Sequence, residues 1–271
     1  EKVTYTTLYS SEATTLNYLI PSSTNENAVT ANLIDTLVEY DRFGNIQPSL
    51  AESWESTEDQ LVWTFHLRQN AVWVDYKGEE YAKVKAQDFV ESARYILNAK
   101  NASETAKGLY DVIAGAEAYY KGTAEPAEGE EKAPEMAWDT VGVKALDDYT
   151  LQYTLSQPTP YLLSCMTYGS FMPAYGPQLE ELGAEFATSN DKMYYNGAFI
   201  LTEFEPQVKH TYVKNVNNWD ADNVKLDGIS RIYNAEAATL APTMALRGEV
   251  DYADLSNDII DDWQANYPDI I

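Results

Sequence analysis

The stretch Asn45–Phe89 carries the pattern that decides the fold, and its centre reads LVWTFHLR at Leu61–Arg68. Leu, Trp, Phe and Leu occupy alternate positions of this octapeptide, with Val, Thr, His and Arg between them. A period of two predicts a strand with one buried face. PSLAESW at Pro48–Trp54 precedes the strand and AVW at Ala71–Trp73 follows it. The stretch therefore predicts a hairpin-like strand region whose aromatic face needs a partner sheet or helix.

Two further blocks show equally regular patterns. Apolar residues recur at helical spacing in Phe89–Leu97, directly after the polar lead Lys85–Asp88, which predicts an amphipathic helix. The sequence VGVKALDDYTLQYTL at Val141–Leu155 consists of two alternating runs around Asp147–Asp148. This arrangement predicts a β-hairpin with its turn at the two aspartates.

These blocks, in this order, resemble the extracytoplasmic peptide-binding proteins of oligopeptide ABC importers, which form family 5 of the solute-binding proteins. The similarity is greatest to the oligopeptide-binding lipoproteins of Gram-positive bacteria. It rests on LAESWE at Leu50–Glu55, WTFHLRQNAVW at Trp63–Trp73, GEEYAKVKAQDF at Gly78–Phe89, VGVKALDDYT at Val141–Thr150 and NGAF at Asn196–Phe199. The resemblance implies an α/β (mixed α+β) fold. We expect a periplasmic-binding-protein-like class II lobe, with a mixed sheet flanked by helices, and a small extra domain.

The resemblance also implies a division of the chain. We expect residues 1–44 to form the first part of lobe I, residues 45–165 the small domain II, and residues 166–271 the rest of lobe I. Family members are nearly twice as long, so the chain resembles an N-terminal fragment that ends where lobe III would begin. Within domain II, the segment Thr123–Glu135 reads TAEPAEGEEKAPE. Its low hydrophobicity predicts a flexible, solvated loop.

Other elements follow from local patterns. Lys2–Tyr9 alternates as a first strand, and the stripe of Val and Leu in Ala28–Tyr40 predicts a helix. A strand opening at Asp227, a helix over Glu236–Leu246 and a strand over Gly248–Tyr252 form a strand–helix–strand series. Such a unit makes part of the sheet parallel.

The first candidate ligand residues are Ser22, Ser23, Thr24 and Asn25. The resemblance implies that residues here line the ligand cleft, where small polar side chains let a peptide backbone approach and form main-chain hydrogen bonds. The alternative is an ordinary polar loop that caps a helix starting at Asn25 or Asn27.

The remaining candidates are Tyr110, Tyr252, Ala253 and Asp254. The last three lie at the carboxyl end of the strand expected at Gly248–Tyr252, and open α/β sheets bind ligands at the carboxyl ends of their strands. The resemblance implies that they line side-chain pockets, and that Tyr110 faces the peptide. In the alternative, Tyr110 is a core or surface tyrosine and Asp254 caps a following helix.

Composition narrows the function classes. The 271 residues include 43 acidic and 18 basic side chains and carry a net charge of −25, which disfavours nucleic acid as a partner. No apolar run is long enough to span a membrane. Cys165 is the single cysteine, so no internal disulfide can form.

Motifs for catalysis or metal binding are not apparent in the sequence. The two histidines, His66 and His210, are far apart in the sequence and lack zinc-ligand spacing. The run Asp220–Gly228 begins like a calcium loop, but Val224 and Lys225 stand where an oxygen ligand and the glycine belong. We therefore expect no cofactor and no enzyme activity, with a hydrolase using paired carboxylates as the remote alternative.

The resemblance implies a substrate-binding component of an ABC importer. It would bind extended oligopeptides between two lobes and deliver them to the transmembrane subunits of a permease. We expect an extracytoplasmic monomer, a cell-surface lipoprotein of a Gram-positive bacterium or a periplasmic protein of a Gram-negative one, held at the membrane only by an N-terminal lipid anchor absent from this chain. Dipeptides, nickel chelates, haem or oligosaccharides are alternative ligands, and an adhesion or signalling module is an alternative role.

Overall fold

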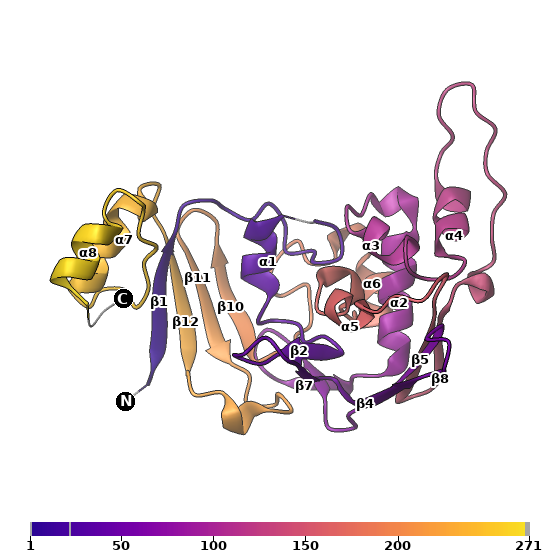
Figure 1. Cartoon of the computed structure of the whole chain (residues 1–271), viewed down its shortest axis with the longest axis horizontal. Coiled ribbons are helices and arrows are strands. Elements are labelled where there is room, and N and C mark those ends of the chain that lie inside the picture. The colour runs from indigo at the N-terminus through magenta and orange to yellow at the C-terminus, as the bar shows by residue number, and fades with distance from the viewer. Residues whose placement is uncertain (1, 22, 269–271) are drawn as a thin grey trace.

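The computed structural model describes residues 2–21 and 23–268. Figure 1 shows two regions side by side along the long axis of the molecule. One region contains a four-stranded sheet with α7 (Ala237–Leu246) and α8 (Ile260–Asn266) at its outer edge. The other contains a second four-stranded sheet and a group of helices.

The first sheet has the order β1-β12-β11-β10. The first strand of the chain pairs in parallel with β12, and the other neighbours are antiparallel, so the sheet is mixed. One helix, α1 (Thr24–Thr30), lies against this sheet, because the Tyr212 hydroxyl donates a hydrogen bond to the Val29 carbonyl at 3.3 Å. The strands are β1 (Thr4–Tyr9), β12 (Gly228–Tyr233), β11 (Lys209–Lys214) and β10 (Phe199–Glu205).

The second sheet has the order β4-β5-β9-β8 and is antiparallel throughout. Helix α2 (Ala86–Leu97) packs against β8 and β9. Two short hairpins join the regions. The strands of the sheet are β4 (Ala51–Ser56), β5 (Val62–Leu67), β9 (Thr150–Thr154) and β8 (Val143–Asp147), and those of the hairpins are β2 (Val38–Tyr40), β3 (Ile46–Pro48), β6 (Val72–Val74) and β7 (Glu80–Lys83).

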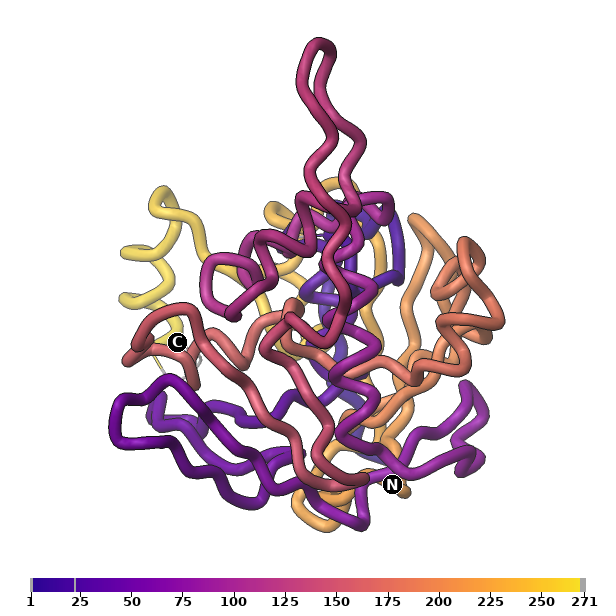
Figure 2. Tube along the Cα trace, turned by 90° about the vertical axis from the view of Figure 1, so that its right-hand side faces the viewer, coloured from indigo at the N-terminus to yellow at the C-terminus, as the bar shows by residue number. Residues whose placement is uncertain are grey.

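The remaining helices are short. They are η1 (Ala99–Asn101), α3 (Ala106–Tyr110), α4 (Ala116–Thr123), η2 (Trp138–Thr140), α5 (Leu162–Cys165), η3 (Gly169–Phe171), α6 (Gly176–Leu182), η4 (Gly183–Glu185) and η5 (Ala221–Asn223). After α4 the chain forms a long loop that projects away from the body of the molecule in both views (Figures 1 and 2). The flexibility of this loop stays a prediction.

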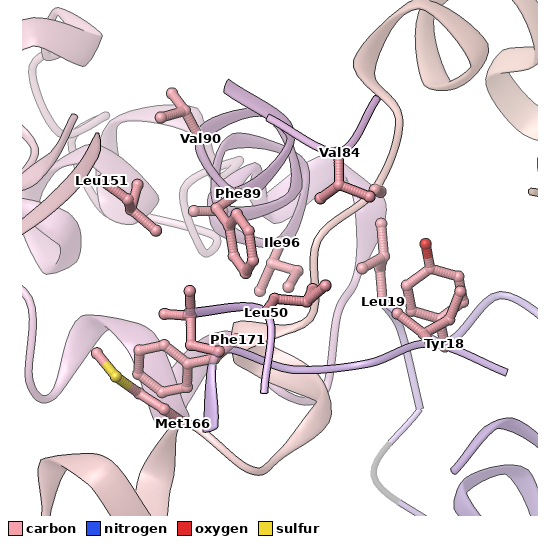
Figure 3. Close-up of a cluster of buried hydrophobic side chains, with 14 of the residues drawn as sticks. Tyr18, Leu19, Leu50, Val84, Phe89, Val90, Ile96, Leu151, Met166 and Phe171 are labelled. Carbon is pink, nitrogen blue, oxygen red and sulfur yellow. The ribbon is translucent and has the colours of Figure 1, made fainter. Parts of the chain in front are cut away.

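One continuous apolar core extends through both regions. Figure 3 shows Leu50 of the N-terminal part beside Phe89 and Ile96 of α2, with Phe171 close by. Each fully buried side chain of this size contributes about 1.5–3 kcal/mol to folding. The alternating strand predicted around Trp63 and Phe65 therefore forms for the expected reason, because its apolar face joins the core.

Several predicted elements are confirmed. The strand Val62–Leu67, the helix Ala86–Leu97 and the hairpin Val143–Thr154 lie within one to three residues of their predicted bounds. The first strand, Thr4–Tyr9, and the mixed character of the sheet are confirmed as well. The predicted fold class is therefore correct.

The predicted helix over Ala28–Tyr40 is wrong. Helix α1 ends at Thr30, and Val38 already belongs to strand β2. The carbonyl of Leu33 accepts hydrogen bonds from the backbone N–H groups of Asn196 and Gly197 at 3.2 and 2.9 Å. These long-range bonds hold the apolar stripe in a buried turn instead of a helix.

The predicted strand over Gly248–Tyr252 is also wrong, because this segment forms no ladder. Asp251 does contact the edge of β1. Its backbone N–H donates to the Thr6 carbonyl at 2.8 Å, and its carboxylate accepts from the Thr6 N–H at 2.7 Å. The parallel pairing comes from β1 and β12 instead of from the predicted strand–helix–strand unit.

Candidate functional site

One candidate cavity lies at the carboxyl end of β1. It has a volume of about 240 Å³ and is bounded by Thr7–Ser10, by the start of α7 and by Tyr252–Asp254. The alanines of α7 that face it, Ala237, Ala238 and Ala241, leave room for a ligand. The three predicted residues therefore lie together at a strand end, although the strand expected to precede them does not form.

Two side chains at this cavity interact with each other. The Tyr252 hydroxyl donates a hydrogen bond to Oδ1 of Asp254 at 2.6 Å, and this bond raises the pKa of Tyr252. Tyr252 is 51% exposed, so its ring is available to a ligand. The alternative role of Asp254, a cap of the following helix, does not occur, because α8 begins only at Ile260.

The second group of candidates lies at the start of α1. Ser23 and Thr24 are exposed and Asn25 is half-buried, whereas Ser22 lies outside the described residues. The helix begins at Thr24, earlier than the alternative start at Asn25 or Asn27. Ser23 donates its hydroxyl hydrogen bond to the carboxylate of Glu26.

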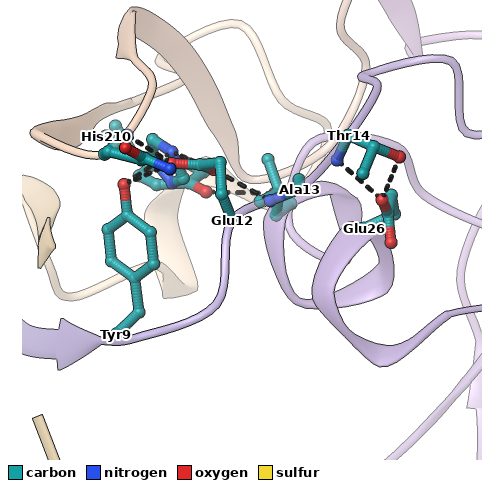
Figure 4. Close-up of polar contacts among 9 residues, drawn as sticks. Tyr9, Glu12, Ala13, Thr14, Glu26 and His210 are labelled. Carbon is teal, nitrogen blue, oxygen red and sulfur yellow. Dashed lines mark hydrogen bonds and ion pairs between the residues drawn. The ribbon is translucent and has the colours of Figure 1, made fainter. Parts of the chain in front are cut away.

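Glu26 fixes this segment against the preceding loop. Its Oε1 accepts hydrogen bonds from the backbone N–H and the hydroxyl of Thr14 at 2.7 and 2.8 Å (Figure 4). Burial opposes ionisation of this carboxyl, but the bonds from Thr14 outweigh burial and hold the pKa of Glu26 below its ordinary value. The ionised carboxylate of Glu26 therefore fixes the start of α1, and with it the positions of the exposed residues Ser23 and Thr24.

A second, partly buried carboxylate fixes the chain where it leaves β1. Glu12 accepts from the Tyr9 hydroxyl at 2.8 Å and lies 3.0 Å from Nε2 of His210 (Figure 4). The imidazole is fully buried between the rings of Tyr9 and Phe204, with centroids at 4.6 and 4.7 Å. Burial lowers the pKa of His210, although Glu12 acts in the opposite direction. His210, left without a role by the sequence, is thus a structural residue.

Tyr110 does not join either group. It ends α3, half-buried, and its ring centroid lies 5.1 Å from that of Tyr120. The described residues that line the cavity at Tyr252–Asp254 do not include it. The structure therefore places Tyr110 among core-packing side chains, and a role in ligand contact stays a prediction.

Sequence reasoning missed a cavity of about 370 Å³ beside the second group. Pro21 and Asn27, which flank the segment of Ser23 and Thr24, form one wall. The other walls come from Thr105 and Gly108 at α3 and from the α5–η3 segment, including Cys165, Tyr168, Gly169, Ser170 and Phe171. Tyr168 is 68% exposed. No periodic pattern in the sequence marks Tyr168 as a cavity residue.

A further cavity, of about 570 Å³, lies between α2 and α6. It contains none of the predicted site residues. Asp88 lies at its base, where burial raises the pKa of the carboxyl to about 7.

A family model described as "Bacterial extracellular solute-binding proteins, family 5 Middle" matches residues 45–269. The chain belongs to this family. It is a family of solute-binding proteins rather than of enzymes, so the resemblance stated from the sequence blocks is confirmed. Within the described residues, no helix is long and apolar enough to cross a bilayer, and no group of three or more His, Cys, Asp or Glu residues is arranged to hold a metal.

Curated relatives of the chain are named as oligopeptide-binding proteins. The chain is 37% identical over 262 residues to the oligopeptide-binding protein SarA of Streptococcus gordonii, covering 90% of this chain and 38% of the relative. It is 37% identical over 236 residues to the oligopeptide-binding protein AmiA of Streptococcus pneumoniae, covering 84% of this chain and 33% of the relative. The chain thus spans about a third of the length of these proteins.

Solved structures confirm the fold class. OppA of Listeria monocytogenes, solved bound to peptide, superposes with a TM-score of 0.83 at 27% identity. The match covers 98% of this chain and 49% of that protein. The arrangement of sheets and helices described above is therefore that of about half of such a binding protein.

Proposed function

We propose that the full-length protein is the substrate-binding component of an ABC importer and that it binds extended oligopeptides. The observation that carries this proposal is the match of nearly the whole chain to oligopeptide-binding relatives at 37% identity. The geometry supports it, because two cavities adjoin exposed segments that can contact a peptide backbone. Binding of this kind relies on main-chain hydrogen bonds and side-chain pockets and needs no catalytic group.

We assign the predicted residues roles within this proposal. Ser22, Ser23, Thr24 and Asn25 contact the peptide main chain. Tyr252, Ala253 and Asp254 line a side-chain pocket, and the Asp254 carboxylate favours a basic or amino-terminal group there. Tyr110 contributes to a pocket wall.

The proposal extends to location and partners. The protein acts as a monomer outside the cytoplasm, as a cell-surface lipoprotein of a Gram-positive bacterium. The closed, ligand-bound form docks on the transmembrane subunits of the permease. No reaction is catalysed, and the names of the streptococcal relatives support the assignment.

The first experiment identifies the natural ligand. The full-length protein is purified natively and denatured, and the released small molecules are analysed by mass spectrometry. We expect a ladder of mixed peptides. A sugar, haem or a metal chelate would overturn the peptide assignment and keep the family, and an empty protein would be tested with added peptides by calorimetry.

A second experiment tests the main-chain contact. Thr24→Pro removes one backbone N–H at the first position of α1, where proline is compatible with a helix. We expect about a tenfold or greater loss of peptide affinity, since a tenfold change corresponds to about 1.4 kcal/mol. Thr24→Ala keeps the N–H and serves as the matched control. Unchanged affinity in the proline variant would remove Thr24 from the site.

A further inference from the structure

The cavity between Pro21 and the α5–η3 segment has no charged wall. None of its nine lining residues is Asp, Glu, Lys, Arg or His. Four other cavities of the described chain each include at least one acidic or basic side chain, as shown by Asp88, Asp35, Asp254 and Lys132. In a chain with a net charge of −25, a concave surface without charge is a distinctive local environment.

The walls of this cavity are anchored, so its shape is already formed. Phe171 is only 3% exposed and belongs to the apolar core (Figure 3), and Ser170 is 8% exposed. Gly108 permits close contact between α3 and η3, because a Cβ at this position would lie 2.9 Å from Oγ of Ser170. A volume of about 370 Å³ falls in the range of preformed ligand pockets, about 300–1,000 Å³.

The cavity lies directly beside the segment assigned to main-chain contact. Pro21 and Asn27, which form one wall, enclose that segment in the sequence. A peptide held along Ser23 and Thr24 would therefore present a side chain to this cavity. Tyr168, which is 68% exposed, and the half-buried thiol of Cys165 offer apolar contact surface there.

From these observations, which rest on the proposed function, we infer that this cavity is a side-chain subsite specific for uncharged apolar or aromatic residues of the peptide. A charged side chain placed here loses its water and finds no partner of opposite charge, which is unfavourable. An aromatic or aliphatic side chain gains the burial of its apolar surface. The subsite thus differs from the cavity at Asp254, which carries a carboxylate.

The test uses the full-length protein freed of ligand and a series of alanine pentapeptides. In this series Phe, Leu, Lys or Asp replaces Ala at each position in turn, and affinities are measured by calorimetry. At one position, we expect Phe and Leu to bind at least about tenfold more tightly than Lys and Asp, which corresponds to about 1.4 kcal/mol. Equal affinities at every position would overturn the inference.

A pair of variants assigns that preference to this cavity. Thr105 lines it and directly precedes α3, and Asp and Asn are so similar in size that the two variants differ mainly in charge. Thr105→Asp should shift the preference toward Lys at the same peptide position, whereas the uncharged Thr105→Asn should keep the preference for Phe. If both variants retain the preference of the parent protein, the subsite lies elsewhere.

Cys165 supplies an independent readout, because its thiol lines the cavity. Iodoacetamide labelling of Cys165, quantified by mass spectrometry of its proteolytic peptide, should slow by about tenfold when the Phe peptide is bound at saturation. Labelling at an unchanged rate, with peptide binding shown by calorimetry, would overturn the subsite alone. The absence of heat for every peptide would instead overturn the proposed function on which it rests.

Discussion

At the scale of single residues, Glu12 connects polar groups from two distant parts of the chain. Its carboxylate accepts hydrogen bonds from the Tyr9 hydroxyl at 2.8 Å, the Ala13 N–H at 2.9 Å and the Gln207 N–H at 2.7 Å. It also pairs with the buried imidazole of His210 at 3.0 Å. Glu12 therefore joins the end of β1 to the turn between β10 and β11.

Glu12→Ala would leave these donors without their acceptor, and Tyr9, Ala13 and His210 are buried. We expect the free energy of unfolding to fall by about 2–4 kcal/mol, measured by urea denaturation. Glu128→Ala, in the exposed loop after α4, is the matched control and should change it by less than about 0.5 kcal/mol. Similar values for the two variants would contradict the assigned role of Glu12.

The candidate site could be predicted from single residues only in part. Tyr252 and Asp254 do lie at a cavity, but it is at the end of β1, because the strand that local periodicity predicts over Gly248–Tyr252 does not form. Glu12, His210 and Tyr168 could not be assigned in this way. Their surroundings come from segments up to 201 residues apart, and no spacing within one segment records such contacts.

At the level of elements, the difference between local patterns and long-range contacts explains which predicted helices and strands are wrong. The strand Val62–Leu67 and the helix Ala86–Leu97 follow from their own residues, because each has one apolar face with a regular period. The segment after Thr30 has a helical stripe too, but Leu33 bonds to Asn196 and Gly197 instead. Tertiary hydrogen bonds overrode local propensity there.

Helix α2 starts at a buried carboxylate that should make stability depend on pH. Oδ2 of Asp88 accepts hydrogen bonds from the Trp73 indole at 2.8 Å and the Lys85 N–H at 2.9 Å. Burial nevertheless raises the pKa of Asp88 to about 7. An unfolded Asp has a pKa of about 3.9, so between about pH 4 and pH 7 the folded chain holds a proton that the unfolded chain has lost. This group therefore reduces stability as the pH rises through that window.

Asp88→Asn removes this titration while keeping an amide oxygen that can accept both bonds. We expect the stability of the variant relative to the parent to increase with pH, by on the order of 1.4 kcal/mol per pH unit between about pH 4 and 7. Urea unfolding of both proteins at intervals across this range measures the difference. Burial also raises the pKa of Asp35 to about 7. This residue is present in both proteins, so its contribution to the pH dependence cancels in the difference. A difference that is constant or that decreases with pH would contradict the prediction.

In the molecule as a whole, the division into residues 1–44, 45–165 and 166–271 remains a prediction, and the packing shows how closely these segments are joined. The core is one cluster that includes Leu33, Phe89 and Tyr195, one from each segment. Backbone bonds also cross between segments, since Val74 and Tyr195 exchange N–H···O=C bonds at 2.8 and 2.9 Å. A shared core opposes separate unfolding of the small domain.

We therefore predict that the 271-residue chain unfolds in a single cooperative transition, although chains longer than about 150 residues commonly show intermediates. Tryptophan fluorescence reports mainly on residues 45–165, which contain Trp54, Trp63, Trp73 and Trp138, while far-UV circular dichroism reports on both sheets. The two signals should give the same urea midpoint. If fluorescence changes at lower urea than circular dichroism, the small domain opens first and its share of the common core is too weak to couple it to the rest of the chain.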